Sequence, residues 1–292
     1  MTVYATLAET KAQMDAQSST DDAKLFTLLQ QVSSRIDRMF LPRRRGPVFA
    51  PVIQTRGNFR LDGSRVNSGL GTFYIGEPLL SLNGVSVNSQ TVTVGSGVQV
   101  YQGDESPYLN LQLLNRCCGG WFQYAQCAGC AEIPFVSIAG VWGYNVDYPN
   151  AWVNTLQSIQ NMGGINASAT SITVTDPEAA NEPGNAPAFS PGSLLQIESE
   201  WLDVTAVDAT LNTITVRRGG NGSTAAAHAN GVAIYTYQVD PAINRATYRQ
   251  AAFEYARIGV YDAAKSTGGA SAEFAPDVLY EFGALLTLFA NW

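Results

Sequence analysis

Four cysteines within fourteen residues are the strongest candidates for local chemistry in this sequence. They are Cys117, Cys118, Cys127 and Cys130, and they lie in a segment rich in glycine and aromatic residues. Four thiolates can bind Zn²⁺ tetrahedrally, although the adjacent pair Cys117–Cys118 departs from the usual spacing of zinc ligands. The same side chains could instead form two disulfides after cell lysis, or pack as free thiols. These three states stay open, zinc is the one cofactor suggested, and none of them gives the segment a catalytic role.

Acid–base or nucleophilic catalysis would depend on few residues, because the chain contains a single histidine, His228. Glu198 and Glu200, with Asp203 nearby, are candidates for the carboxylate pair of a glycoside hydrolase. Two residues apart on a strand, however, they would share one face, which is more typical of a solvated strand surface. His228 lies among alanines without a local partner, and we expect it to be structural. Since no glycine motif completes a phosphate-binding fingerprint, we predict that the chain is not an enzyme.

Charge is scarce and unevenly distributed. Charged residues make up 14% of the chain, against a typical ~25%, and the net charge is −7. Residues 1–65 hold ten basic and six acidic residues, whereas residues 66–292 hold seven basic and eighteen acidic ones. The acidic remainder argues against a general DNA-binding protein. Arg43, Arg44 and Arg45 are either a solvated face that complements a helix C-terminus or a docking strip for an acidic partner surface.

The C-terminal stretch is the most apolar part of the sequence. It runs from Val278 to Trp292, contains Glu281, and is shorter than the ~20 residues that a membrane span needs. The N-terminus lacks the pattern of a signal peptide, so we expect no membrane association. We expect this C-terminal segment to be a partner interface, formed by Asp277, Leu279, Phe282, Leu285, Leu286, Phe289 and Trp292.

Helices are predicted at both ends of the chain. Thr6 and Glu9 fit a capping box, which begins a helix that we expect to end at about Ala16. A second, amphipathic helix follows Asp21 and Asp22, with Leu25, Leu28, Leu29, Val32, Ile36 and Met39 on one face, and Pro42 ends it. Asp240-Pro241 begins a later helix, which we expect to end near Gly259.

Between these helices the pattern predicts short strands. We expect strands at 72–75, 79–87, 90–94, 99–101 and 133–142, with a tight hairpin turn at Asn83-Gly84. Further strands at 171–175, 194–197, 201–204, 213–216 and 233–237 indicate a small barrel or sandwich. The predicted fold class is therefore α+β. Residues 1–41 and 239–292 form a helical bundle, 42–160 a β-rich central region with the cysteine loop, and 161–238 an inserted small β module.

Several segments, taken in order, are similar to a known family. The opening Tyr4-Ala5-Thr6-Leu7-Ala8-Glu9, the strand ending Gly140-Val141-Trp142-Gly143-Tyr144 and the helix after Asp240-Pro241 resemble head–tail connector (adaptor) proteins of tailed bacteriophages. Residues 168–237 resemble a small β module that recurs in phage structural proteins. Its marks here are Phe189-Ser190-Pro191-Gly192, Ile197-Glu198-Ser199-Glu200 and Arg218-Gly219-x-Asn221-Gly222-Ser223, followed by His228.

The resemblance implies a structural protein of the virion neck, assembled in the host cytoplasm. Copies of the chain, about twelve of them, would form a ring that docks on the portal protein and extends the DNA channel toward the tail. A downstream neck or tail completion protein would bind below it, and DNA would pass through the lumen without sequence-specific binding. The alternative from composition is a carbohydrate-binding or adhesion module of a virion, and a glycoside hydrolase is third.

Overall fold

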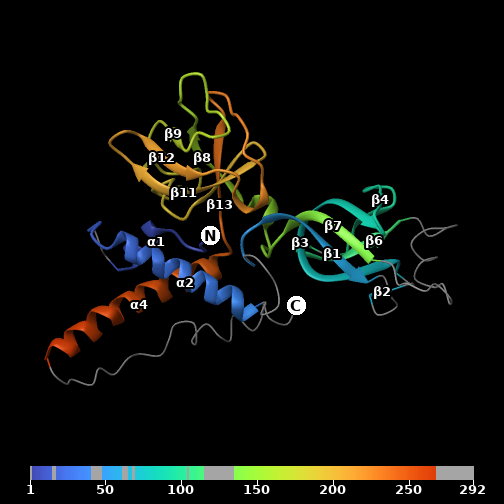
Figure 1. The fold of residues 1–292 in the computed structure, drawn as a ribbon, viewed down its shortest axis with the longest axis horizontal. Coiled ribbons are helices and arrows are strands. Elements are labelled where there is room, and N and C mark those ends of the chain that lie inside the picture. Colours follow the sequence, from blue (N-terminus) through green and yellow to red (C-terminus); the bar gives the residue numbers. More distant parts are fainter. Residues whose placement is uncertain are drawn as a thin grey trace. The chain divides into compact units, whose positions relative to one another are not determined.

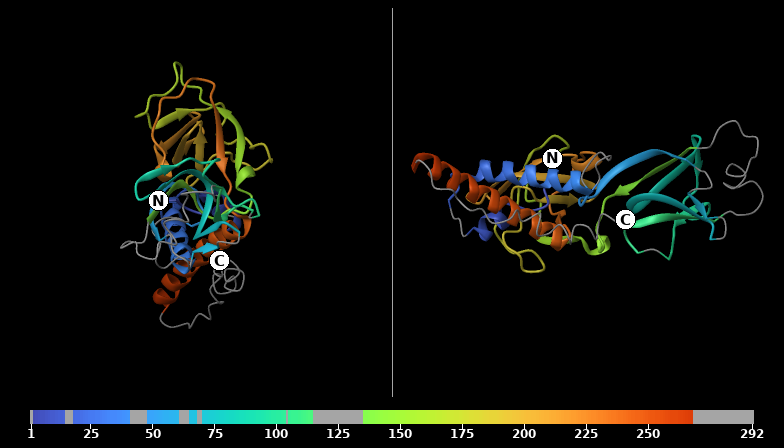
Figure 2. Two further views of the ribbon diagram at one scale, coloured as in Figure 1. Left: turned by 90° about the vertical axis from the view of Figure 1, so that its right-hand side faces the viewer. Right: turned by 90° about the horizontal axis from the view of Figure 1, so that it is seen from below.

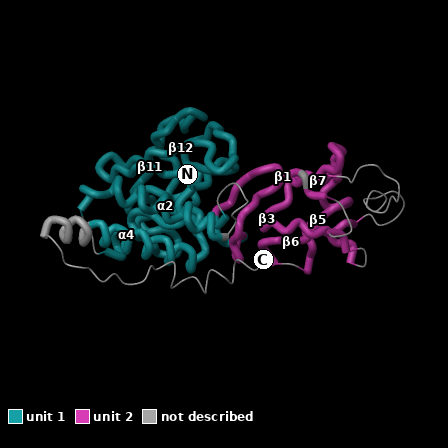
Figure 3. The backbone as a smooth tube through the Cα atoms, turned by 60° about the horizontal axis from the view of Figure 1, so that its bottom comes forward, with its two compact units in different colours: residues 1–49, 149–292 teal, residues 50–148 magenta. Residues whose placement is uncertain are grey.

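The computed structural model describes most of the chain and divides it into two units. It describes residues 2–14, 18–40, 48–60, 65–67, 70–103, 105–114 and 135–267. One unit comprises the described residues of 1–49 and 149–292, and the other those of 50–148 (Figure 3). Several predicted site residues lie outside the described ranges. They are Arg43, Arg44 and Arg45, the four cysteines Cys117, Cys118, Cys127 and Cys130, and the C-terminal interface residues Asp277 to Trp292.

The described chain is mostly β, so the predicted α+β class with a helical bundle is wrong. Two antiparallel sheets of seven and six strands make up its two units, and three α-helices lie on one side of the six-stranded sheet (Figure 1). The physical reason lies in the cores. In each unit strand residues form a large hydrophobic cluster of their own, so the helices are a layer beside one sheet and do not define the fold.

The three helices of the first unit begin where the sequence predicts. They are α1 (Leu7–Gln13), α2 (Asp22–Phe40) and α4 (Pro241–Thr267). The capping box at α1 is confirmed, since the Thr6 side chain accepts from the Glu9 amide and Glu9 accepts from the Thr6 amide. The predicted end of the last helix near Gly259 is wrong, because α4 continues to Thr267. One glycine costs a helix about 1 kcal/mol and does not by itself end it.

Helices α2 and α4 lie side by side (Figures 1 and 2). Arg35 forms an ion pair with Glu254 at 2.8 Å, and the Tyr255 hydroxyl donates to Asp21 Oδ2 at 2.7 Å. The predicted apolar face of α2 is buried at Leu25, Leu28, Leu29, Val32 and Ile36, whereas Met39 is 47% exposed. The amphipathic pattern therefore identified the buried face of α2 except for its last turn.

The six-stranded sheet closes on itself as a small barrel. Its order is β8 (Trp152–Ser158), β13 (Ala233–Tyr237), β10 (Leu194–Ile197), β11 (Glu200–Asp208), β12 (Thr213–Arg217) and β9 (Ser171–Thr173). Hydrogen bonds join the two ends of this order: Gln160 N–H donates to the Thr173 carbonyl at 2.8 Å, and Thr173 N–H donates to Asn161 Oδ1 at 2.8 Å. All five strands predicted in this region are present, and β8 is an additional one.

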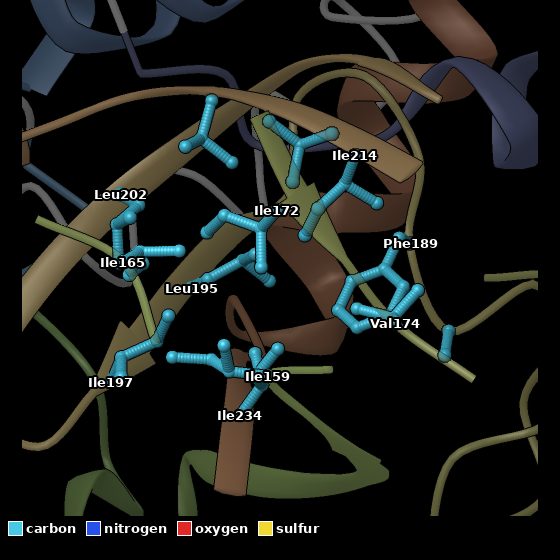
Figure 4. Close-up of a cluster of buried hydrophobic side chains, with 13 residues drawn as sticks. Ile159, Ile165, Ile172, Val174, Phe189, Leu195, Ile197, Leu202, Ile214 and Ile234 are labelled. Carbon is cyan, nitrogen blue, oxygen red and sulfur yellow. The ribbon is translucent and has the colours of Figure 1, made fainter. Parts of the chain in front are cut away.

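The barrel interior is filled by aliphatic side chains and one phenylalanine (Figure 4). Alternate residues of β12 show why the strand forms: Ile214 and Val216 are buried, while Thr213, Thr215 and Arg217 are more exposed. Burying one such side chain contributes about 1.5–3 kcal/mol. The alternation predicted from Thr213 to Val216 is therefore the packing pattern of the barrel wall.

The seven-stranded sheet forms the second unit. Its main order is β1 (Val52–Arg60), β7 (Phe135–Trp142), β3 (Thr72–Val87), β6 (Tyr108–Leu113) and β5 (Val98–Val100); β2 (Val66–Asn67) and β4 (Gln90–Val92) also pair with β3. In β7, Gly140 permits a close approach of β3, since a Cβ there would lie 2.4 Å from the Ser81 carbonyl oxygen. Trp142 is fully buried, and its Nε1–H donates to the Gln54 carbonyl at 2.9 Å.

The predicted hairpin turn at Asn83-Gly84 is wrong. Strand β3 runs through it, with an irregularity in its pairing with β7 between Leu82 and Gly84. The turn lies instead at Asn88-Ser89, where φ is 46° and 67°, and Val87 pairs with Gln90 across it. A two-residue turn with both central residues at positive φ joins antiparallel strands with the right twist. Asparagine adopts that conformation with little strain, so Asn88 serves where Asn-Gly was expected.

Candidate functional site

Glu198 and Glu200 lie at the hairpin that joins β10 and β11, and their side chains converge on His228. Ile197 pairs with Glu200, which leaves Glu198 and Ser199 as a two-residue turn with φ of 52° at Glu198. The prediction that the two glutamates share one face of a strand is therefore wrong. One belongs to a turn and is largely exposed, while the other begins a strand and is fully buried.

His228 is buried, and each of its ring nitrogens lies against a carboxylate. Nδ1 is 2.7 Å from Glu198 Oε2, and Nε2 is 2.9 Å from Glu200 Oε2. Its backbone exchanges two hydrogen bonds with Ile165, each 2.9 Å long. As predicted, no residue near His228 in the sequence bonds to its ring, and the two carboxylates come from a hairpin about thirty residues earlier in the chain.

Arg218 completes the cluster by binding Glu200 with two nitrogens. Nε lies 2.7 Å from Oε1, and Nη2 lies 2.6 Å from Oε2. The guanidinium also donates to the carbonyl groups of Asn166, Ala169 and Ala226. Both side chains of this ion pair are buried, so the pair lies inside the barrel unit with its hydrogen-bonding capacity used internally.

The Glu200 carboxylate accepts five hydrogen bonds in all. Besides the two from Arg218, the backbone N–H groups of Gly219 and Ala226 donate to it, each at 3.0 Å. His228 supplies the fifth, and because an ionised carboxylate can only accept, Nε2 carries the proton in that contact. We name Glu200, Arg218 and His228 the barrel clasp, since they fasten the loop after β12 to the β10–β11 hairpin.

The barrel clasp keeps Glu200 ionised. Burial by itself would raise the pKa of Glu200, but the hydrogen bonds from Arg218, Ala226, His228 and Gly219 together lower that pKa from 4.5 to about 2. A general acid needs a pKa near the working pH, and the acid of a glycoside hydrolase needs a raised one. The environment of Glu200 is therefore suited to holding a permanent anion and not to proton transfer.

A second buried polar cluster joins the N-terminal segment to the end of the helical part. Tyr4 donates its hydroxyl hydrogen to Asp37 Oδ1. The backbone N–H of Val48 lies 2.8 Å from the Tyr4 oxygen and 2.9 Å from Asp37 Oδ1. Phe49 N–H also points at the Tyr4 oxygen, at 3.2 Å. These hydrogen bonds hold residues 48–49 against α2, and Asp37 is the one charged side chain that takes part in them.

Burial governs the pKa values in this second cluster. It raises the pKa of Asp37 from 3.8 to about 6, although hydrogen bonds from Tyr4 and Val48 act in the opposite direction. Burial, followed by the negative charge of Asp37, raises the pKa of Tyr4 well above 10. The folded structure therefore disfavours the ionised form of Asp37, whereas it favours the ionised form of Glu200.

Neither cluster offers a metal or membrane site. Within the described ranges, no three His, Cys, Asp or Glu side chains come together in a way that could hold a metal ion. No helix in the part of the chain that the structure covers is long and apolar enough to cross a bilayer. Comparison of the sequence with protein-family models and with curated proteins gave no match.

The residues of the barrel clasp belong to two motifs that lie apart in the sequence. Glu200 belongs to Ile197-Glu198-Ser199-Glu200, and Arg218 and His228 begin and end the other long motif that resembles phage modules. Each motif taken alone indicates a turn or a loop. Their pairing depends on the register of β10 with β11 and on the Ile165–His228 bridge, which sequence spacing does not specify.

Arg218 and its neighbour Arg217 allow a matched test of the clasp. We expect Arg218→Ala to lower the free energy of unfolding of the barrel unit by about 3–5 kcal/mol, because it leaves Glu200 buried without its ion-pair partner. Arg217 is 54% exposed and pairs with Asp203 at the surface, so Arg217→Ala should cost at most about 1 kcal/mol. Urea unfolding followed by tryptophan fluorescence measures both, and equal losses would refute a special role for the clasp.

Asp37 allows a test by pH. Because its pKa is raised in the folded state, its contribution to stability is present below about pH 4 and is lost as pH rises through about 6. Asp37→Asn keeps the position neutral, so we expect the variant to gain stability over the wild type between pH 4 and pH 7. At 1.36 kcal/mol for each pKa unit, the gain is at most about 3 kcal/mol. Melting curves across this range should show it, and a difference independent of pH would contradict the cause.

Proposed function

We propose that this chain is a structural head-to-tail connector of a tailed bacteriophage, located in the virion neck. Copies form a ring that docks on the portal protein, extends the DNA channel toward the tail and receives a downstream neck or tail completion protein. The supporting observation is the role of the motif residues in the barrel. Glu200, Arg218 and His228, which carry the resemblance to phage modules, bind one another inside the unit. Motif residues that bind one another inside the barrel stabilise its fold, which is the role expected of them in a structural subunit.

The charge distribution supports an assembly role. A ring subunit buries two different faces against its neighbours, and charged residues are depleted from interface cores. A charged fraction of 14% agrees with a surface that is covered by other copies. Among the described acidic and basic side chains, several of the most buried form ion pairs within the chain, such as Arg218–Glu200 and Arg56–Glu77.

The net charge supports passage of DNA. Each chain carries −7, so a ring of about twelve copies would carry roughly −84. DNA is repelled by such a field and would slide through the lumen without binding. The basic segment that includes Arg43, Arg44 and Arg45 would then face the neighbouring copy or the portal, and the apolar segment from Asp277 to Trp292 would pack against the portal.

The arginine triplet provides the test. We expect the triple variant Arg43→Glu, Arg44→Glu, Arg45→Glu to lose docking on the purified portal, since like charges would meet at the interface. The matched control replaces the same three residues with lysine and keeps the charge, so it should dock. Electron-microscope images of each protein mixed with portal show rings directly. Wild-type protein that leaves the portal bare would overturn the proposed function, and unchanged docking of the glutamate variant would remove the arginines from it.

A further inference from the structure

A large open cavity lies within the first unit, between the N-terminal segment and one end of the barrel. It is lined by residues 2–9 and 11–12, by parts of the loop between β9 and β10, and by the end of β13. Its volume is about 1070 Å³, at the upper end of the range of about 300–1,000 Å³ that is usual for ligand pockets. The barrel clasp is not part of the lining, so the stability of the barrel does not explain the polar groups around this space.

The charged side chains of the lining leave an excess of negative charge. Glu178 is exposed and forms no ion pair with any described residue. Glu9, the second carboxylate, accepts hydrogen bonds from neutral groups of the described chain. Lys11 is the one cation of the lining, and it is paired with Asp22 at 2.9 Å. No described cation therefore compensates the two glutamates.

The surrounding chain adds to this negative charge. Residues 149–216, which belong to the same unit, contain seven acidic residues and no lysine or arginine. Glu200 and Asp203 are paired with arginines that follow this stretch. Asp176 and Glu182, on either side of Glu178 in the loop, are exposed. A concave surface with one sign of charge attracts ligands of the opposite sign, so the occupant of this cavity is expected to be cationic.

Asn181 places a second requirement on the occupant. The residue lines the cavity and is 6% exposed, and its Oδ1 accepts from the Asn185 amide at 2.8 Å. The Nδ2 group has two hydrogens to donate and no partner among the described residues. Thr236, also in the lining, is 8% exposed, and no described residue bonds to its hydroxyl group. Buried polar groups without partners are costly, so the occupant must bring hydrogen-bond acceptors as well as positive charge.

The loop that carries the free carboxylate and the free amide is held by backbone hydrogen bonds. Ala188 N–H donates to the Ala179 carbonyl at 2.8 Å, and Glu182 N–H donates to the Asn154 carbonyl, in β8, at 2.9 Å. The charge and the donor are therefore in place before a ligand arrives. Such preorganisation lowers the entropy that binding costs.

These two requirements exclude several classes of ligand. An anion would be repelled by Glu178 and Glu9. A metal ion or a polyamine carries positive charge but offers no acceptor to Asn181. The rings of Tyr4 and Phe189 are buried, so they present no open face on which a sugar could stack. A polypeptide segment meets both requirements, because a basic side chain supplies the charge and the backbone carbonyl groups supply the acceptors.

We propose that this cavity binds an arginine-bearing peptide segment of a partner protein. The Glu178 carboxylate pairs with the arginine side chain, and Asn181 Nδ2 and the Thr236 hydroxyl donate to backbone carbonyl groups of the same segment. Arginine suits the position because its guanidinium binds a carboxylate through two parallel hydrogen bonds. The inference goes beyond the connector function, which assigns no partner to this cavity.

A short synthetic peptide tests the binding with the full-length protein. The probe is Gly-Arg-Ala-Arg-Gly with a fluorescent label, and its binding is followed by anisotropy. We expect saturable binding that weakens about fivefold in Glu178→Gln, as loss of one exposed ion pair predicts. Thr236→Val keeps the shape of the side chain but removes the hydroxyl group, and it should weaken binding about threefold.

Two matched controls isolate the charge. Glu182→Gln removes the same charge from the same loop, but residue 182 is not part of the lining, so this variant should bind as the wild type does. A peptide with citrulline in place of both arginines has nearly the same shape without the charge, and it should bind at least about tenfold more weakly.

Three results would overturn the inference. They are absence of saturable binding at millimolar peptide, equal losses in Glu178→Gln and Glu182→Gln, and citrulline peptide that binds as tightly as the arginine peptide. Displacement of the probe by maltopentaose would also overturn it, because it would identify a sugar site. Since no portal protein enters this experiment, its failure is distinct from a failure of the connector function.

Discussion

The buried negative charge of Glu200 is the constraint on which the first unit depends. A carboxylate without solvent is tolerated only when its oxygens are fully paired, and five donors from Arg218, Gly219, Ala226 and His228 meet that requirement. Arg218 in turn binds the carbonyl groups of Asn166 and Ala169. One charged group thereby determines the position of the β10–β11 hairpin, the loop after β12 and the segment before β9.

The helices are connected to this barrel by polar contacts as well as by apolar packing. At the start of α1, Leu7 N–H donates to the Pro191 carbonyl and Ala8 N–H donates to Ser190 Oγ, both at 3.1 Å. Helix N-termini leave such N–H groups without partners inside the helix, and here the barrel loop provides the acceptors. The side of this junction that is not closed by such contacts is the cavity with the unpaired groups of Asn181 and Thr236.

Local patterns in the sequence predicted the elements well where one rule acted alone. The Thr6–Glu9 capping box, the Asp240-Pro241 helix start and the alternating strands of the barrel all depend on residues close in sequence. Prediction failed where distant residues decide the outcome. Asn83-Gly84 lies inside β3 because β7 pairs with β3 on both sides of it, from Leu79 to Val87. Strand β1 was missed because Gln54, Thr55 and Arg56 make it polar, although Phe59 and Trp142 pack beside it. The predicted fold class was wrong for the same reason. The sequence indicated individual helices and strands, but it did not show that the large hydrophobic clusters are formed by strand residues.

The candidate site shows the same limit more sharply. Composition identified His228 and the two glutamates as the only local candidates for acid–base chemistry, but their contacts arise from pairings about thirty residues apart in the sequence. Those contacts make Glu200 a structural anion. The most direct test is an NMR titration of the Glu200 side-chain carboxyl in the intact protein. We expect its pKa to lie near 2, and a value at or above the ordinary 4.5 would contradict the assignment of this residue to structure.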